Sequence, residues 1–128
     1  MKIAVVGSRT FTDFASFSRV MRDCIKRGDI IISGAARGAD ALAKRWADEN
    51  GFDIVEYPAD WAKLGPGAGF ARNRTIIGEC DQCIAFWDGE SPGTEHSIRL
   101  CKAWKKPVRI EYFTKRGDGE NDLSDMFA

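Results

Sequence analysis

The sequence predicts an α/β fold: one doubly wound sheet of five mainly parallel strands, in the order 3-2-1-4-5, with helices on both faces. Five short apolar runs alternate with stretches of helical period, and this alternation is typical of a parallel sheet covered by helices. The chain has 128 residues, of which 44% are hydrophobic. This size and composition fit a single domain with one core.

Partly β-branched apolar runs predict the five strands, at residues 2–7, 29–33, 53–57, 82–87 and 108–113. The first helix joins the first two strands. Its apolar side chains recur at i, i+3, i+4, i+7 and i+8 from Phe17 to Ile25, which places them on one helical face. Gly28 is expected to end this helix.

The remaining connections predict three more helices and one long loop. The same helical spacing recurs from Ala39 to Ala47, and Gly51 is the expected cap. The third connection starts with a loop over 58–69 that is rich in glycine and proline, as is typical of a functional segment or a linker. A helix is expected from about residue 68 to 79, and another within 93–105.

Residues 1–113 are expected to form the folded domain, and residues 114–128 a polar, mobile C-terminal tail. The chain has 19 basic and 19 acidic residues, so its formal net charge is zero. This balance argues against a protein that wraps duplex DNA or an anionic membrane through its overall charge. The tail holds two basic and four acidic residues, so the domain carries a net charge of +2, which leaves room for a small anionic ligand.

The apolar runs are too short to span a bilayer, and the first of them is too short for a signal peptide. We therefore expect a cytoplasmic protein with no membrane partner. The four cysteines include a CxxC pair, Cys80 and Cys83, but the chain has a single histidine and this pair leads into an apolar strand. We interpret the cysteines as ordinary buried thiols and expect no metal and no cofactor.

Ligands of a doubly wound sheet bind outside the carboxyl ends of its strands. The loops after the first, second and fourth strands combine glycine with hydroxyl residues, and the first two add arginine. Glycine lets a backbone approach a ligand, free amides at a helix N-terminus bind anions, and arginine binds phosphate through two hydrogen bonds. The predicted ligand- and phosphate-binding residues are Gly7, Ser8, Arg9, Ser33, Gly34, Arg37, Gly38, Asp40, Arg72, Asn73, Asp88, Gly89, Ser91, Gly93 and Thr94.

The alternative interpretation of these loops is purely structural, with glycine and serine shaping turns and arginine solvated at the surface. Arg72 favours a ligand. It is expected in the first turn of its helix, where a cation opposes the helix dipole unless an anion lies nearby. Trp61 and Phe70 flank the long loop. We expect them either to stack on the base of a ligand, or to pack in the core or in a lid over the site.

Two acidic residues near these loops have open alternatives. Asp40 contacts the ligand, or it caps its helix or forms a salt bridge with Arg37. Asp88 contacts a ribose hydroxyl or holds a loop amide.

Five ordered segments carry a family resemblance: VVGSRTF at 5–11, SGAARGADALA at 33–43, YPADW at 57–61, AGFARN at 68–73 and FWDGESPGT at 86–94. Together they resemble the SLOG superfamily, named for Smf/DprA and LOG proteins, in its small YspA/YpsA-related branch of bacterial and phage proteins. The resemblance runs from residue 1 to about 113. It implies a Rossmann-like domain that binds nucleotides or nucleotide-derived ligands, and a homodimer or higher homo-oligomer.

The resemblance also implies two alternatives to a nucleotide sensor or sequestering protein. LOG members hydrolyse an N-glycosidic bond with an arginine and the glutamate of P-G-G-x-G-T-x-x-E. Gly93 and Thr94 match the G-T, but Ser97 occupies the glutamate position. A nucleotide-processing hydrolase of the N-glycosidic or phosphate bond would therefore use other catalytic candidates, namely Arg72, Asp88 and Glu95. The second alternative is single-stranded DNA binding, as in DprA members.

Overall fold

A single parallel sheet organises residues 1–114, the part of the chain that the computed structural model describes. Its strand order is β3-β2-β1-β4-β5, and every neighbouring pair is parallel. The predicted fold class is therefore confirmed. Apart from Thr114, the predicted tail lies outside the described residues. The strands are β1 (Lys2–Gly7), β2 (Ile30–Ser33), β3 (Asp53–Glu56), β4 (Gln82–Trp87) and β5 (Val108–Tyr112).

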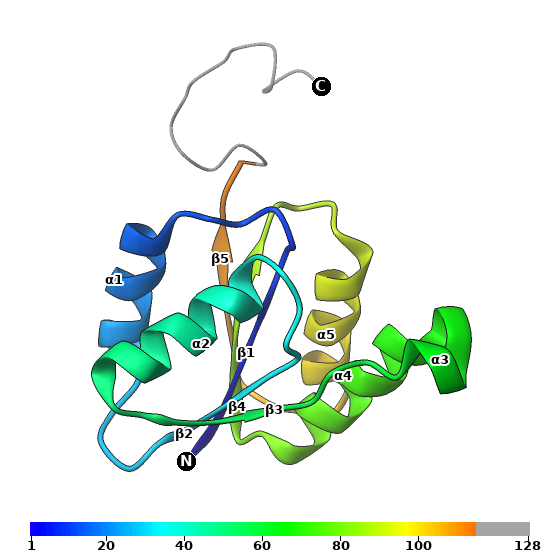
Figure 1. Cartoon of the computed structure of the whole chain (residues 1–128), viewed down its shortest axis with the longest axis horizontal. Helices are drawn as coiled ribbons and strands as arrows, with labels where there is room; N and C mark the ends of the chain where they lie inside the picture. The colour runs from blue at the N-terminus through cyan, green and yellow to red at the C-terminus, as the bar shows by residue number, and fades with distance from the viewer. Residues whose placement is uncertain (115–128) are drawn as a thin grey trace.

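Four main helices connect the strands, with α1 and α2 on one side of the sheet and α4 and α5 on the other (Figure 1). The helices are α1 (Phe14–Cys24), α2 (Ala39–Asn50), α4 (Ala68–Glu79) and α5 (Pro92–Ala103). The apolar pattern from Phe17 to Ile25 lies mostly within α1, but the helix ends at Cys24 and not at the expected Gly28. It begins at Phe14, where the Asp13 carboxylate caps it by accepting a hydrogen bond from the Ser16 amide at 3.1 Å.

The long third connection contains short helices where the sequence predicted an irregular loop. A single turn, α3 (Trp61–Leu64), is followed by a 3₁₀ turn, η1 (Gly65–Gly67). Asp60 caps α3 by accepting a hydrogen bond from the Lys63 amide at 3.0 Å. This segment projects from the body of the domain, at the right of Figure 1.

Alternate side chains of the strands pack into two separate cores, one on each face of the sheet. Ile3 and Val5 of β1 pack towards α1 and α2, in a core that includes several phenylalanines. Ala4 and Val6 pack towards α4 and α5, in a core whose fully buried members are aliphatic residues and cysteines. The two faces of one strand therefore contribute to cores of different composition.

All four cysteines are free; Cys80, Cys83 and Cys101 are buried and Cys24 is half-buried. Burial raises the pKa of Cys80 to about 11. Residues 1–114 contain no cluster of three or more His, Cys, Asp or Glu side chains able to hold a metal ion. Within the same range, no helix has the length and apolarity needed to cross a membrane.

Candidate functional site

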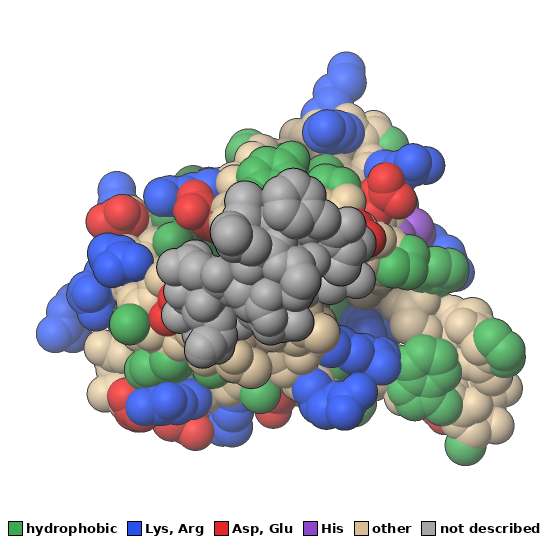
Figure 2. Space-filling model, turned by 90° about the horizontal axis from the view of Figure 1, so that it is seen from above, with side chains coloured by type: hydrophobic (Ala, Val, Ile, Leu, Met, Phe, Trp, Pro, Cys, Tyr) green, Lys and Arg blue, Asp and Glu red, His purple; other side chains and the backbone are tan. Residues whose placement is uncertain are grey.

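A cavity of about 370 Å³ lies at the carboxyl edge of the sheet, between the strand ends and helices α4 and α5. The loops after β1, β2 and β4 all contribute to its wall. Figure 2 looks onto this edge and shows Lys and Arg side chains beside the projecting segment, where the surface is hollowed. The predicted site residues that line it are Gly7, Ser8, Arg9, Gly34, Asp40, Arg72, Asn73, Ser91, Gly93 and Thr94.

Close backbone packing holds two of these loops together and explains two of their glycines. Gly38 has a positive φ of 71°, and a Cβ there would overlap the Ser8 carbonyl and the Arg9 backbone. Gly34 faces the Arg72 guanidinium so closely that a Cβ would overlap it. The loops after β1 and β2 therefore pack closely because Gly38 lacks a side chain, and Gly34 leaves room for the Arg72 guanidinium of α4.

Arg72 crosses the cavity and joins α4 to the loop after β2. Its Nη1 donates to the Gly34 carbonyl at 2.6 Å, and its Nε donates to Asn73 Oδ1 at 3.2 Å. Burial lowers the pKa of Arg72, the charge of Asp40 opposes that effect, and the charge of Arg9 lowers the pKa further. An anion bound here would reduce the repulsion between the two arginines.

The position of Arg72 differs from the sequence-based prediction. Because α4 begins at Ala68, Arg72 lies in the second turn and not in the first, so the helix-dipole argument does not apply to it. The link to Gly34 and the half-buried side chain place it in the cavity instead.

Asp40 supplies a buried carboxylate in the first turn of α2. The residue is 7% exposed, and its Oδ2 accepts a hydrogen bond from the Ala36 amide at 3.1 Å. Burial raises the pKa of this carboxyl. The predicted alternative of a salt bridge with Arg37 is not found among residues 1–114, where Arg37 is exposed and does not line the cavity.

Asp88 organises the loop that leads into α5. Its Oδ1 accepts hydrogen bonds from the Ser91 amide at 2.7 Å and the Glu90 amide at 2.9 Å, and its Oδ2 accepts one from the Ser91 hydroxyl at 2.9 Å. Of the two predicted alternatives, this geometry is that of a residue holding loop amides. The first turn of α5, including Gly93 and Thr94, consequently lines the cavity, and within the described residues no side-chain hydrogen bond caps it.

Asn73 connects α4 to α5 in the wall of the cavity. Its Nδ2 donates to the Gly93 carbonyl at 3.1 Å and lies 3.2 Å from His96 Nδ1. The His96 ring packs against Phe70, with a centroid separation of 4.5 Å. Burial, and then the charge of Arg74, lower the pKa of His96. A neutral His96 accepts the Asn73 hydrogen bond through Nδ1.

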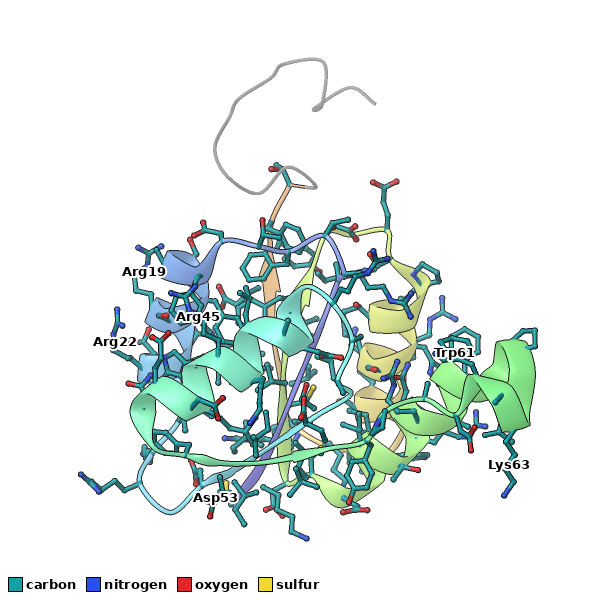
Figure 3. The ribbon with its side chains drawn as sticks, viewed as in Figure 1. Arg19, Arg22, Arg45, Asp53, Trp61 and Lys63 are labelled. Carbon is teal, nitrogen blue, oxygen red and sulfur yellow. The ribbon has the colours of Figure 1, made fainter. Side chains whose placement is uncertain are left out.

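Two aromatic side chains stand at the cavity mouth. Trp61 is 50% exposed and Phe70 is 45% exposed, and both line the cavity. Figure 3 shows Trp61 directed from α3 towards α5, whereas Lys63 points away from the domain. The Arg9 guanidinium carbon lies 6.0 Å from the Trp61 ring centroid. Flat rings and a cation therefore share this part of the wall.

Comparison with known proteins supports the resemblance expected from the sequence. A family model that describes the YspA, cpYpsA-related SLOG family matches residues 1–64. The Gene 61 protein of Mycobacterium phage D29 is 35% identical over 116 residues, an alignment covering 84% of this chain and 93% of that protein. This chain belongs to the YspA, cpYpsA-related SLOG family.

Two solved structures share the fold of this SLOG domain. DNA processing protein A from Helicobacter pylori, solved to explain its single-stranded DNA binding mode, superposes with a TM-score of 0.67 at 25% identity, covering 99% of this chain and 73% of that one. DNA processing protein A (DprA) from Streptococcus pneumoniae gives a TM-score of 0.69 at 25% identity, with coverages of 99% and 56%. Both confirm the Rossmann-like architecture.

Several predicted site residues of the SLOG domain lie outside the cavity wall. Ser33 is fully buried beneath it, and Gly38 packs behind the loop after β1. Gly89 makes a turn with a positive φ of 85°. Glu95 pairs with Arg99 at 3.4 Å on the surface of α5.

Sequence reasoning also missed wall residues, notably Val6 and Ile76. Both belong to the apolar pattern that predicts core packing, so the sequence carries no signal that separates a cavity floor from a core. Pro66 lines the cavity from the loop predicted over 58–69.

Proposed function

We propose that the chain binds a nucleotide or nucleotide-derived molecule in the cavity, as a sensor or a sequestering protein. The observation that carries this proposal is the convergence of Arg9, Arg72 and the first turn of α5 on one cavity of about 370 Å³. Arginine side chains and helix N-termini bind phosphate. The volume is in the range of small-molecule sites.

The aromatic side chains at the mouth support a ligand that also carries a flat ring. Trp61 and Phe70 are each about half exposed, so their rings remain accessible beside the arginines. Stacking of a base on an aromatic ring contributes about 1–3 kcal/mol. A molecule that combines a phosphate with a base fits both features.

A panel of nucleoside mono-, di- and triphosphates and cyclic dinucleotides tests this proposal by thermal shift and calorimetry. We expect at least one member to raise the melting temperature at millimolar concentration, because a ligand that binds only the folded state stabilises it by mass action. Tryptophan fluorescence is a second readout, since Trp61 lines the cavity. A panel without any shift would contradict the proposal.

Two arginines of α4 provide a matched pair of variants. Arg72 lines the cavity, whereas Arg74 is exposed and outside it. We expect Arg72→Gln to weaken nucleotide binding about 10- to 100-fold, because a hydrogen bond from a charged group contributes about 1.5–3 kcal/mol. Arg74→Gln should change affinity by less than about threefold. Equal losses would show that general surface charge, and not the cavity, binds the ligand.

Single-stranded DNA is the second candidate ligand, favoured by the structural similarity to DNA processing protein A of Helicobacter pylori. Arg9 and Arg37 are exposed at the same edge of the sheet. If they contact a DNA backbone, the affinity for a labelled oligo(dT) should fall steeply with salt. A flat salt dependence would contradict this candidate.

The geometry supports hydrolysis less well than binding. Glu95 does not line the cavity, and the Asp88 oxygens accept hydrogen bonds from the loop. Among the described residues of the wall, Asp40 is the one carboxylate. Release of free base from a nucleotide, abolished by Glu95→Gln or Asp88→Asn, would favour the hydrolase over a binding protein.

A further inference from the structure

The Asp40 carboxylate is almost fully buried, yet within residues 1–114 only one of its oxygens accepts a hydrogen bond of good geometry. Oδ2 accepts the Ala36 amide at 3.1 Å. Oδ1 accepts no hydrogen bond of good geometry from residues 1–114, although Asp40 lines the cavity and is only 7% exposed. A carboxylate accepts hydrogen bonds through both oxygens, so Asp40 retains an acceptor for a donor inside the cavity.

Among residues 1–114, no cation forms an ion pair with this carboxylate. The charge of Arg72 lowers the pKa of Asp40, but within residues 1–114 no ion pair of 4.0 Å or less joins the two side chains. Arg72 donates to Gly34 and Asn73 instead. The buried Ser33 hydroxyl makes a hydrogen bond of poor geometry to Asp40, which lowers the pKa of the carboxyl, and within residues 1–114 no hydrogen bond of good geometry reaches that hydroxyl.

This arrangement favours a neutral donor from the ligand at Asp40 and disfavours an anion. A buried charge without a full set of partners is unfavourable, and a hydrogen-bond donor relieves that penalty. A phosphate beside Asp40 would add a like charge, whereas the side of the cavity formed by Arg9 and the first turn of α5 attracts it. The cavity therefore has an anion-binding side and a hydroxyl-binding side.

We propose that Asp40 binds a ribose hydroxyl of the ligand and that the site selects ribonucleotides over deoxyribonucleotides. Ribose is the neutral, donor-bearing part of a nucleotide that lies next to the phosphate. The inference rests on the proposed nucleotide function and deepens it. It also separates that function from DNA binding, because the 2′-hydroxyl distinguishes the two sugars.

The first experiment uses the unmodified full chain. The ribonucleotide that binds best in the panel is compared by calorimetry with its 2′-deoxy and 3′-deoxy forms. We expect at least one deoxy form to bind about 10- to 100-fold more weakly, as for loss of a hydrogen bond to a charged acceptor. Equal affinities would overturn the role of Asp40 and leave nucleotide binding intact. Absence of binding by every nucleotide would overturn both proposals.

The second experiment compares Asp40→Asn with Asp48→Asn on the same helix. Asp48 is a suitable control because its side chain is 60% exposed and pairs with Lys44. Asp40→Asn should reduce the ribose preference to less than about threefold and should raise the affinity for inorganic pyrophosphate, because the repelling charge is gone. Asp48→Asn should change neither quantity.

The effects of Asp40→Asn on nucleotide and on pyrophosphate binding distinguish a contact with the ligand from a purely structural role of Asp40. A purely structural role of Asp40 would weaken nucleotide and pyrophosphate binding together, and that result would overturn the inference. So would a ribose preference that survives in Asp40→Asn, since another group would then contact the hydroxyl. If Asp40→Asn instead removes a preference between two bases on the same ribose phosphate, Asp40 contacts the base and the inference is wrong.

Discussion

The two faces of the sheet are built from the same strands but carry different side chains. On the face covered by α1 and α2, Phe11, Phe17 and Phe86 stack with centroid separations of 4.8 to 6.4 Å. On the face covered by α4 and α5, the fully buried side chains are aliphatic residues and cysteines. The cavity of about 370 Å³ lies at the carboxyl edge of this second face, whereas a smaller cavity of about 200 Å³, lined by Phe11 and Phe86 among others, lies on the aromatic face.

This difference predicts that the side chains that stabilise the fold and those proposed to bind a ligand lie mainly on different faces of the sheet. Large aromatic side chains contribute most of the burial that holds a small domain together. The cavity face carries polar groups that reduce stability, above all the buried Asp40 carboxylate and the half-buried Arg72. Substitutions on the two faces should therefore change the free energy of unfolding by different amounts and, for some residues, in opposite directions.

The largest expected effect is on the aromatic face. Phe86→Ala removes a ring that is 2% exposed and stacked on two others, and should lower the free energy of unfolding by about 3–5 kcal/mol. Val6→Ala, at the cavity floor, should lower it by about 1–2 kcal/mol. Urea denaturation measures both. Equal losses would show that the cavity face is packed as tightly as the aromatic face.

The second effect tests how the cavity wall is held together. Gly38 and Gly51 have nearly equal φ values of 71° and 72°, but ψ is −127° at Gly38 and 31° at Gly51, and of the two only Gly38 has a place where a Cβ would overlap neighbouring backbone. Gly38→Ala should lower the free energy of unfolding by about 2–3 kcal/mol and weaken nucleotide binding, and Gly51→Ala should lower it by about 1 kcal/mol. Thermal denaturation measures the difference. If the two variants lose equal stability, the backbone contact of Gly38 is not a constraint.

The third prediction is a gain in stability, on replacement of the buried Asp40. Because burial raises the pKa of Asp40, the folded chain holds its proton to a higher pH than the unfolded chain does. Stability is therefore lost as the pH rises from about 4, the ordinary value for Asp, through the folded pKa. At pH 7, Asp40→Asn should add about 1 kcal/mol, or about 3–5 °C in melting temperature.

The measurement is the difference in melting temperature between Asp40→Asn and the parent as a function of pH. This difference should vanish near pH 3, where Asp40 is protonated in both states. A gain that is the same at every pH would contradict a burial penalty on the charge of Asp40.

The smallest effect concerns the cysteines, which lie mostly on the cavity face. Cys80 is buried, and its pKa of about 11 leaves roughly one thiolate in a thousand at pH 8. We expect iodoacetamide to label the half-buried Cys24 first in the folded chain and all four cysteines in denaturant. Peptide mass spectrometry measures the order. Rapid native labelling of Cys80 would show that the α4 and α5 face opens readily.

The sequence by itself determined the strands, and together with the family resemblance it predicted their order and the edge at which the cavity lies. Apolar runs and helical spacing are local signals, and parallel strands place their carboxyl ends together, so the loops containing Ser8, Gly34 and Gly93 had to meet. The short helices of the third connection were missed because a glycine- and proline-rich segment carries no periodic pattern.

Only the tertiary structure decided what each polar residue of that edge does. Arg72 contacts Gly34 across 38 positions of the chain, and Asp40 lies beside Arg72 without an ion pair in the described part of the chain. Asp88 accepts hydrogen bonds from its own loop, while Glu95 forms an ion pair with Arg99 outside the cavity. These outcomes depend on distances of a few ångströms between segments far apart in the sequence, which local patterns do not encode.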